Sequence, residues 1–349
     1  MTALTEYRAA MDAQGSHPAA TVMGVAGGFI ASIAVHVVTK VGVAAQLADG
    51  PRDVADLAKT CGVDADALHR TLRLLVAVGL FAEPSPRVFA HNAASELLRA
   101  GVPGSLRDMV LWWADPLHLR VYAEFEHSLR TGRTCVERVL GLPIFDYLRT
   151  DPEESAVFNA AMVAISGQVV PAVLDAYDFS GIGTLVDVGG GHGSVLAAVL
   201  ARYPEMRGVL ADLDHVVAGA GPTLARFGVA DRCRAVACDF FASVPGGGDA
   251  YILKNIVHDW DDAKSVAILT AIRTALADRP GRVLLIEAVV APGSTPDLAK
   301  FIDLEMLTLP GGRERMEAEY AALFARAGFR LARVVPTRSP MAVIEAVPA

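Results

Sequence analysis

Cysteine and positive charge are both scarce in this chain. It has four cysteines among 349 residues, and no two of them form a C-x-x-C pair. Such scattered cysteines exclude a disulfide framework and give no sign of structural zinc, which fits a reducing cytoplasm. Lysine and arginine number 31 against 39 aspartates and glutamates, so the formal net charge is −8. Because nucleic-acid binders are normally basic, this acidic chain argues against a nucleic-acid partner.

The beginning of the chain lacks the basic-then-apolar order of a secretory leader, since Glu6, Arg8 and Asp12 fall within it. We therefore expect no export. Residues 18–39 contain no Asp, Glu, Lys or Arg, and this stretch is long enough to span a membrane. Glycines, threonines and His36 dilute its apolarity. We expect a buried or partner-facing helix and no membrane partner.

Composition and length indicate a globular protein of more than one domain. Hydrophobic residues make up 53% of the chain and charged residues 20%, which excludes intrinsic disorder and coiled-coil or collagen-like composition. A chain of this length exceeds one ordinary domain of roughly 100 to 200 residues.

The N-terminal third has the spacing of a helix-turn-helix. An apolar helical face begins after Asp53, the sequence 61–63 breaks it, and Asp64 can cap a second helix that ends at Gly79. Residues 88–90 would form the wing of a winged helix. One interpretation is DNA recognition, with Arg70 and Arg73 on the second helix, and the other is a dimerisation module. The acidic charge favours dimerisation through the apolar N-terminal segment.

The C-terminal half alternates short apolar runs with helical stretches. This rhythm predicts a doubly wound parallel sheet with helices on both faces. The last two runs have four residues between them, too few for a parallel crossover, so they should pair as an antiparallel hairpin that points away from a dehydrogenase. Strands are expected at 184–188, 208–211, 233–237, 250–254 and 283–288, with the hairpin at 329–336 and 341–347.

A glycine loop and two acids indicate a nucleoside site at the carboxyl ends of the first strands. The loop 189–193 follows the first strand, although glycines in that place are often plain turns. Asp212 stands just past the second strand, where a carboxylate can bind two ribose hydroxyls. Asp239 ends the third strand beside Phe240, which suggests an amino partner and an apolar wall for an adenine. Each acid alone could be a solvated strand-end residue.

His258 is the candidate general base, because it follows the fourth strand at the same edge and histidine titrates near pH 6.5. A helix-entry residue without chemistry is the equal alternative. Glu287 follows the fifth strand and Glu314 lies in a glycine-containing turn. These acids could converge on His258, or they could be exposed. The acids 259, 261 and 262 could bind magnesium, but an acidic helix start is favoured, and we expect no metal.

These motifs resemble the S-adenosylmethionine-dependent O-methyltransferases of the plant caffeic-acid type and their bacterial natural-product relatives. The resemblance covers nearly the whole chain, and its motifs come in family order. They are the segments 186–193, 211–216, 239–241, 255–260, 286–287 and 311–315.

The resemblance implies a complete active site. It implies His258 as the base, with Glu287 and Glu314 as its supporting acids. It also implies a phenolic acceptor, for which an arginine-rich composition typical of GC-rich bacterial genes suggests a secondary metabolite. The implied residues for S-adenosylmethionine and its product S-adenosylhomocysteine are Ser166, Asp187, Gly189, Gly191, Asp212, Leu213, Asp239, Phe240 and Lys254. The expected acceptor residues are Trp113, Phe158, Met162, Asp259 and Met306.

The resemblance also implies the architecture. A mainly α winged-helix dimerisation domain (1–105) and connecting helices (106–176) should precede a Rossmann-like class I methyltransferase domain (177–349), with a seven-stranded α/β sheet ending in a hairpin, in a cytoplasmic homodimer. Two features depart from the family. Asp214 stands where the family commonly has proline, and the segment 306–310 is about one residue shorter than in the plant members. Relatives of this fold that hydroxylate or decarboxylate leave a second function open. A helix-turn-helix regulator and a nicotinamide dehydrogenase are more distant alternatives.

Overall fold

The computed structural model describes residues 18–349. This part of the chain packs as two compact units. Unit 1 comprises residues 18–123 and 146–167, and unit 2 comprises residues 124–145 and 168–349. The predicted domain boundaries at 105 and 176 stay a prediction, and residues 1–17 of the first domain lie outside the described residues.

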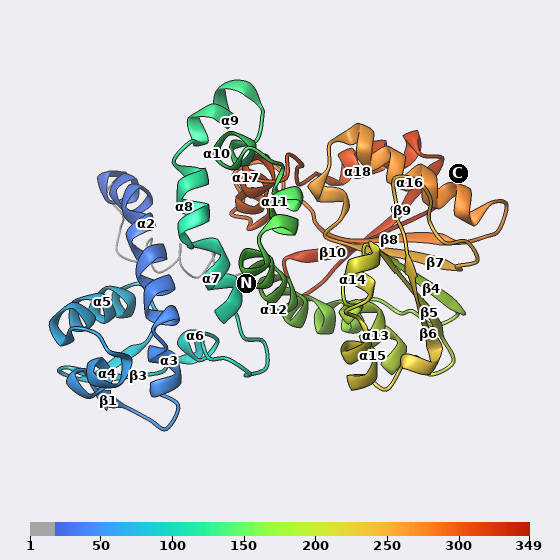
Figure 1. The fold of residues 1–349 in the computed structure, drawn as a ribbon. Coiled ribbons are helices and arrows are strands. Elements are labelled where there is room, and N and C mark those ends of the chain that lie inside the picture. The colour runs from blue at the N-terminus through green and yellow to red at the C-terminus, as the bar shows by residue number, and fades with distance from the viewer. Residues whose placement is uncertain (1–17) are drawn as a thin grey trace. The chain divides into compact units, whose positions relative to one another are not determined.

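Unit 1 is mainly helical (Figure 1). It also carries a small antiparallel sheet with the strand order β1-β3-β2. Two further helices, α11 (Ile144–Thr150) and α12 (Pro152–Ala176), contribute residues to both units. The other elements of unit 1 are α2 (Pro18–Lys40), α3 (Val43–Gln46), β1 (Arg52–Asp53), α4 (Val54–Cys61), α5 (Ala65–Ala77), β2 (Ala82–Ser85), β3 (Val88–Ala90), α6 (Ala93–Glu96), α7 (Arg107–Trp113) and α8 (Pro116–Tyr122).

The predicted helix-turn-helix is confirmed in α4 and α5. The Asp53 carboxylate accepts a hydrogen bond from Ala55 N–H and so caps α4, and the Asp64 carboxylate caps α5 by accepting from Ala67 N–H. Between the helices, Gly62 has a φ of 69°, a left-handed conformation that glycine adopts without a steric penalty. The expected wing at 88–90 is strand β3.

Helix α2 is apolar and mostly exposed. By length and composition α2 and α12 could each cross a membrane, and 11% of the apolar window of α2 is buried against 33% for α12. Burial within the chain therefore does not account for α2, and the partner-facing alternative remains. Its exposed apolar side chains are Val22, Met23, Val25, Phe29, Ile30 and Val37.

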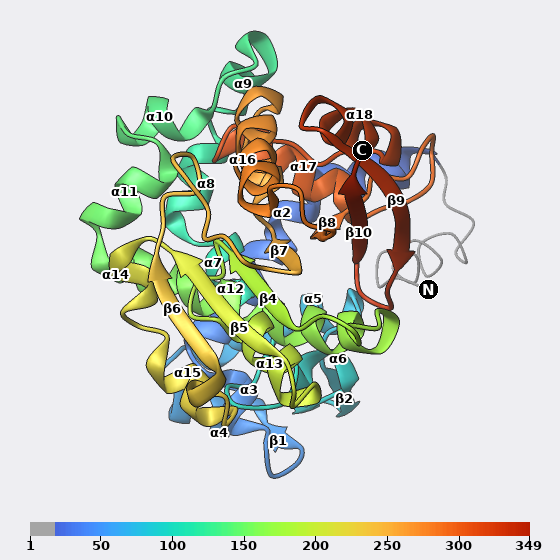
Figure 2. The ribbon, with the colours of Figure 1, turned by 90° about the vertical axis from the view of Figure 1, so that its right-hand side faces the viewer.

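Unit 2 is built on a seven-stranded sheet with the order β6-β5-β4-β7-β8-β10-β9 (Figure 2). The first five of these strands run parallel, and β10 pairs antiparallel with both β8 and β9. The strands are β4 (Thr184–Val188), β5 (Arg207–Asp212), β6 (Cys233–Ala237), β7 (Ala250–Lys254), β8 (Arg282–Ala288), β9 (Phe329–Pro336) and β10 (Met341–Pro348). The terminal hairpin predicted from its four-residue connection is confirmed.

Helices cover both faces of this sheet, with α16 and α18 on one side and α13 and α15 on the other (Figure 1). Alternate residues of each strand serve the two faces, so Val209 joins the core cluster with α16 and α18 while Gly208 lies against α13. The helices that lie wholly in unit 2 are α9 (Phe125–Thr131), α10 (Cys135–Leu140), α13 (Ser194–Arg202), α14 (Asp214–Val217), α15 (Gly221–Arg226), α16 (Asp262–Leu276), α17 (Ala299–Thr308) and α18 (Glu317–Arg326). The unit also has the 3-10 turns η1 (Ala230–Arg232) and η2 (Val257–Asp259).

The strand order reverses beside β4, which pairs in parallel with both β5 and β7. Ligands of open α/β sheets bind at such a switch point. Three residues at this edge lie slightly away from their predicted places. Asp212 is the last residue of β5, Asp239 lies two residues beyond the end of β6, and Glu287 lies within β8.

Candidate active site

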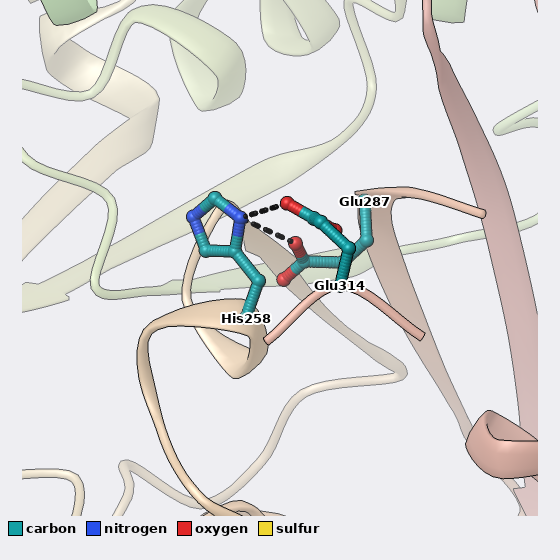
Figure 3. Close-up of side chains that lie close together, drawn as sticks. All are labelled: His258, Glu287 and Glu314. Atoms are coloured by element: carbon teal, nitrogen blue, oxygen red, sulfur yellow. Dashed lines mark hydrogen bonds and ion pairs between the residues drawn. The ribbon is translucent and has the colours of Figure 1, made fainter. Parts of the chain in front are cut away.

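His258 is buried in the 3-10 turn η2, which follows β7 at the carboxyl edge of the sheet. Its Nδ1 atom lies 2.6 Å from Oε1 of Glu314 and 3.7 Å from Oε2 of Glu287. Figure 3 shows both carboxylates approaching the same ring nitrogen. The structure thus brings together the three residues expected in the catalytic set, and the alternative that the two glutamates are exposed is wrong for both.

Glu287 joins strand β8 to the turn that carries His258. Lys254 pairs with Ile286 at the end of the parallel β7–β8 ladder, so the chain leaving β7 passes beside the next residue of β8. Oε1 of Glu287 accepts hydrogen bonds from the backbone N–H groups of Ile256, at 3.0 Å, and Val257, at 2.9 Å. Its other oxygen has no hydrogen-bond partner and faces the imidazole.

Glu314 reaches the imidazole from the loop between α17 and α18. Its backbone N–H donates to the Asp303 carboxylate at 2.9 Å. The neighbouring Arg313 N–H donates to the His258 carbonyl oxygen at 2.8 Å. Gly312 comes so close that a Cβ on it would lie 1.9 Å from that same oxygen. Only glycine permits this approach, and it brings the Glu314 carboxylate within reach of His258.

The charges around His258 favour its protonated form. Burial by itself lowers the pKa of His258, but the carboxylates of Glu287, Asp259 and Glu314 together raise it to about 10. Burial in turn raises the pKa of Glu287 and that of Asp259, because their ionised forms lose hydration. Asp259, expected as an acceptor contact, lies with Oδ1 3.5 Å from Nε2 of His258. Glu314 bonds to the other ring nitrogen, Nδ1.

The glycine loop after β4 brings its backbone close to neighbouring chains. Gly189 has a φ of 68°, and a Cβ on it would lie 2.5 Å from the Ile256 side chain. Asp212 lies beside the loop, where its Oδ2 accepts from Gly191 N–H at 2.8 Å and its Oδ1 accepts from Leu213 N–H at 2.7 Å. The structure therefore brings Asp212, Gly191 and Leu213 together as expected.

Buried polar atoms without partners lie at the same edge. Asp187 is 1% exposed, and neither of its carboxylate oxygens has a hydrogen-bond partner. Burial raises the pKa of Asp187 although Lys254 opposes the shift, and burial lowers the pKa of Lys254. A group that supplies hydrogen-bond donors and positive charge would satisfy Asp187, and the hydroxyls of a ribose would suit Asp212. The ammonium and ribose of S-adenosylmethionine supply both, so these residues fit that group.

Three aromatic rings pack against one another, and two of them directly follow Asp239 in the chain. Phe240 lies 4.9 Å from Phe241, and Phe241 lies 4.9 Å from Trp260, all between ring centroids. Asp239 is exposed, and its carboxylate accepts from Phe241 N–H at 2.9 Å. The indole nitrogen of Trp260 is buried without a hydrogen-bond partner.

The remaining predicted residues belong to different units and are described within each. In unit 1, Ser166 is buried and its hydroxyl donates to the Met162 carbonyl at 2.8 Å. Phe158 packs edge-on against the neighbouring Trp112, while Trp113 is 41% exposed. In unit 2, Met306 is buried on α17.

The acids at 259, 261 and 262 have three separate partners. Asp259 faces His258, Asp261 caps α16 by accepting from Lys264 N–H, and Asp262 pairs with Arg315. The predicted acidic helix start is thus confirmed at Asp261. Ligand-type atoms of His258, Glu287 and Glu314 lie within 4.8 Å of one another, but the 2.6 Å contact between Nδ1 and Oε1 is that of a charge-assisted hydrogen bond.

Residue-based reasoning missed two members of this site. Asn255 has a φ of 54° and a buried side-chain oxygen without a hydrogen-bond partner. Its left-handed conformation turns the chain between β7 and the two N–H groups that bind Glu287. Arg315 is 1% exposed and bonds to the turn around His258. Asn255 lies in the motif 255–260 and Arg315 in the motif 311–315. The enrichment of asparagine in left-handed conformations is the one signal that could have found Asn255.

The sheet order, the terminal hairpin and the helical first unit define a class I methyltransferase with a dimerisation domain. The model of the O-methyltransferase domain matches residues 122–330, and that of the O-methyltransferase dimerisation domain matches residues 23–101. The chain belongs to this O-methyltransferase family, whose enzymes depend on S-adenosylmethionine. The predicted family, fold class and enzyme class are confirmed, and the dehydrogenase alternative is wrong.

Relatives act on oxygen and on nitrogen. Phenazine O-methyltransferase PhzM of Lysobacter antibioticus is 41% identical, over 92% of this chain and 94% of its own. An 8-amino-8-demethylriboflavin N,N-dimethyltransferase of Streptomyces davaonensis is 37% identical, over 86% of each chain. The crystal structure of the O-methyltransferase NcsB1 from neocarzinostatin biosynthesis, in complex with S-adenosylmethionine and 2-hydroxy-5-methyl naphthoic acid, matches with a TM-score of 0.75, at 33% identity, over 91% of this chain and 96% of its own.

Proposed function

We propose that this enzyme transfers a methyl group to a hydroxyl of a small aromatic natural product, with His258 as the general base. The observation that carries the proposal is the contact of Glu314 and Glu287 with one nitrogen of the buried His258. Because Nδ1 is held by these carboxylates, Nε2, which lies 3.5 Å from Oδ1 of Asp259, would face the acceptor. A histidine oriented in this way can receive a proton but makes no covalent bond to the acceptor.

S-adenosylmethionine, when bound, supplies an electrophilic methyl group on its sulfonium. Among the described residues of unit 2, Asp212 would hold the ribose hydroxyls. Asp187 and the glycine loop would hold the amino-acid end of the cofactor. Asp239 and Phe240 would hold the adenine. Lys254 would lie near the nucleoside, and Ser166 of unit 1 would bind the carboxylate. The open carboxylate of Asp187 and the strand-end position of Asp212 support this assignment.

The proton moves between the acceptor hydroxyl and Nε2 of His258. A phenol has a pKa of about 10, and the carboxylates bring the pKa of His258 to about 10 as well despite the opposing effect of burial. Matched affinities allow the proton to pass to the imidazole with little cost in free energy. Glu314 would then stabilise the imidazolium, and Glu287 would hold both the ring and the backbone of its turn.

The proposed acceptor residues remain Trp113, Phe158 and Met162 in unit 1 and Asp259 and Met306 in unit 2. The naphthoic acid bound to the relative NcsB1 supports an aromatic acceptor. The predominance of methyltransferases among the relatives favours methyl transfer over the hydroxylating or decarboxylating alternative. The dimerisation-domain match supports a homodimer rather than a DNA-binding regulator. We retain the expectation of a metal-independent, cytoplasmic enzyme. Full activity in excess chelator would support metal independence.

The direct test is methyl transfer from labelled S-adenosylmethionine to a panel of phenols by wild type, His258→Ala and the control His127→Ala. We expect His258→Ala to lower kcat by roughly 100- to 10,000-fold, the usual contribution of a general base. Its affinity for S-adenosylhomocysteine, measured by calorimetry, should stay within about twofold of wild type, since the ring belongs to proton transfer. Full activity of His258→Ala would remove His258 as the base.

Nitrogen methylation is the second candidate, because one relative dimethylates an amino group. A neutral amine attacks with its lone pair and needs no base before the attack. Aromatic amines should therefore be included in the same panel. If wild type methylates an aromatic amine but none of the phenols, and His258→Ala methylates that amine as well, the acceptor atom is nitrogen.

A further inference from the structure

Arg315 is the largest fully buried side chain of the described residues, with 1% of its surface exposed. A buried guanidinium is costly unless its donors are satisfied. Here it donates to the Val257 carbonyl at 3.1 Å, the Trp260 carbonyl at 2.9 Å and the Asp262 carboxylate at 2.8 Å. A longer contact of 3.4 Å reaches the Ser265 hydroxyl.

The two carbonyls bound by Arg315 flank His258. Val257 begins the turn η2 and Trp260 follows it, so the guanidinium spans the turn from one end to the other. Ser265 is fully buried, and its single hydroxyl proton is shared between the same two carbonyl oxygens, at 3.2 and 3.3 Å. In the part of the chain that the structure describes, the backbone of the turn is therefore held by side chains that make no hydrogen bond to the imidazole.

Arg315 directly follows Glu314 in the chain. Glu314 bonds to the imidazole while Arg315 bonds to the backbone beneath it. Two consecutive residues thus hold the ring and its turn, and a shift of either changes the distance between Nδ1 and Oε1. Backbone pairing with the residues just after β8 supports this segment, since Val290 N–H donates to the Arg315 carbonyl at 3.0 Å.

The charge of Arg315 is balanced outside the catalytic cluster. Its ionic partner is Asp262, which is about half exposed and whose pKa is lowered by the hydrogen bond from Arg315. Within residues 18–349, no hydrogen bond joins the guanidinium to Glu287 or Glu314. Their carboxylates therefore remain available to the imidazole.

We infer that Arg315 is a positioning residue that sets the His258–Glu314 geometry by clamping the backbone on both sides of His258. This inference rests on the proposed role of His258 in proton transfer. Arg315 bonds to the backbone of the turn and to Asp262, so we expect its contribution in the methyl-transfer step and not in cofactor affinity. A misplacement of the base by about 1 Å can cost about 100-fold in rate.

The test compares Arg315→Lys with the control Arg326→Ala, whose guanidinium lies 3.9 Å from the same Asp262. Lysine keeps the charge but cannot span both carbonyls. We expect Arg315→Lys to lower kcat by about 10- to 100-fold, to leave the affinity for S-adenosylhomocysteine within about twofold, and to move the pH profile of kcat. Arg326→Ala should behave as wild type. Added guanidinium should partly restore kcat in Arg315→Ala.

Wild-type kcat and pH profile in folded Arg315→Lys would overturn the inference, and so would a parallel loss of kcat and cofactor affinity. If Arg315→Lys does not fold, Ser265→Ala takes its place, because it removes a hydroxyl from the same carbonyls. An unchanged kcat and pH profile in that variant would then overturn the inference.

Titration of the His258 ring resonance by NMR separates this inference from the proposed function. A change in the His258 titration in Arg315→Lys, combined with full activity in His258→Ala, would contradict the proposed function and support the positioning role. An unchanged titration, combined with an inactive His258→Ala, would contradict the positioning role alone.

Discussion

Gly312 lies directly against the backbone carbonyl of His258, and a Cβ on Gly312 would come within 1.9 Å of that oxygen. The same turn donates the Arg313 N–H to this oxygen and presents Glu314 to the imidazole. The absence of a side chain at position 312 is therefore a condition for the contact between Glu314 and His258.

Gly312→Ala should displace the turn that carries His258. Because the clashing atoms are backbone, we expect a loss of roughly 1 to 3 kcal/mol in the free energy of unfolding and a drop in kcat of about 100-fold. Urea unfolding and methyl-transfer assays measure the two effects. Gly246→Ala is the matched control, because the nearest atom to its new Cβ lies at 3.6 Å, an ordinary contact. Equal behaviour of the two variants would contradict this account.

The rate should rise with pH well above neutrality. Burial opposes the shift, but Glu287, Asp259 and Glu314 raise the pKa of His258 to about 10, so the neutral imidazole is scarce at pH 7 and increases up to about pH 10. We expect kcat/KM for a phenol to increase by up to about tenfold per pH unit over this range. Glu314→Gln removes one carboxylate, which lowers the pKa of His258 and moves the rise to lower pH.

Ionisation of the acceptor also increases with pH, and Glu314→Gln controls for it because the acceptor is unchanged between the two enzymes. Identical pH profiles of wild type and Glu314→Gln would mean that the rise belongs to the acceptor. His258 would then not govern the pH dependence.

Asp212→Ala should lose the affinity for S-adenosylhomocysteine. The carboxylate of Asp212 is placed to accept hydrogen bonds from two ribose hydroxyls, and each charge-assisted bond contributes roughly 1.5 to 3 kcal/mol. We therefore expect a fall in affinity of at least about tenfold by calorimetry, with NADH titrated in parallel as a negative control. Wild-type affinity in Asp212→Ala would show that the ribose binds elsewhere.

Charged residues on helix α2 should prevent dimer formation. Val25 is 79% exposed and Phe29 is 60% exposed, one helical turn apart on an apolar helix. If these side chains are buried against a second copy of the chain, Val25→Asp with Phe29→Asp would place unpaired charges in the interface. Light scattering should give the mass of a dimer for wild type and of a monomer for the double variant. A monomeric wild type would contradict the proposed homodimer.

Much of the fold was predictable because it depends on local patterns. The alternation of apolar runs and helical stretches predicted the parallel sheet, and the four-residue connection between the last runs predicted the hairpin. Asp53 and Asp64 predicted helix starts, because a capping side chain bonds to backbone groups within its own turn. Interactions between residues that are close in the chain can be predicted from the order of the residues alone.

The motifs identified the residues of the site, but the tertiary structure decided how they meet. Residues 258, 287 and 314 are far apart in the chain, and they converge because the register of β7 on β8 places Glu287 beside the backbone of the histidine turn. The sequence left open whether the glutamates were exposed, since burial depends on what packs over them. Arg315 was not recognised for the same reason, because its partners are backbone carbonyls whose positions only the folded chain determines.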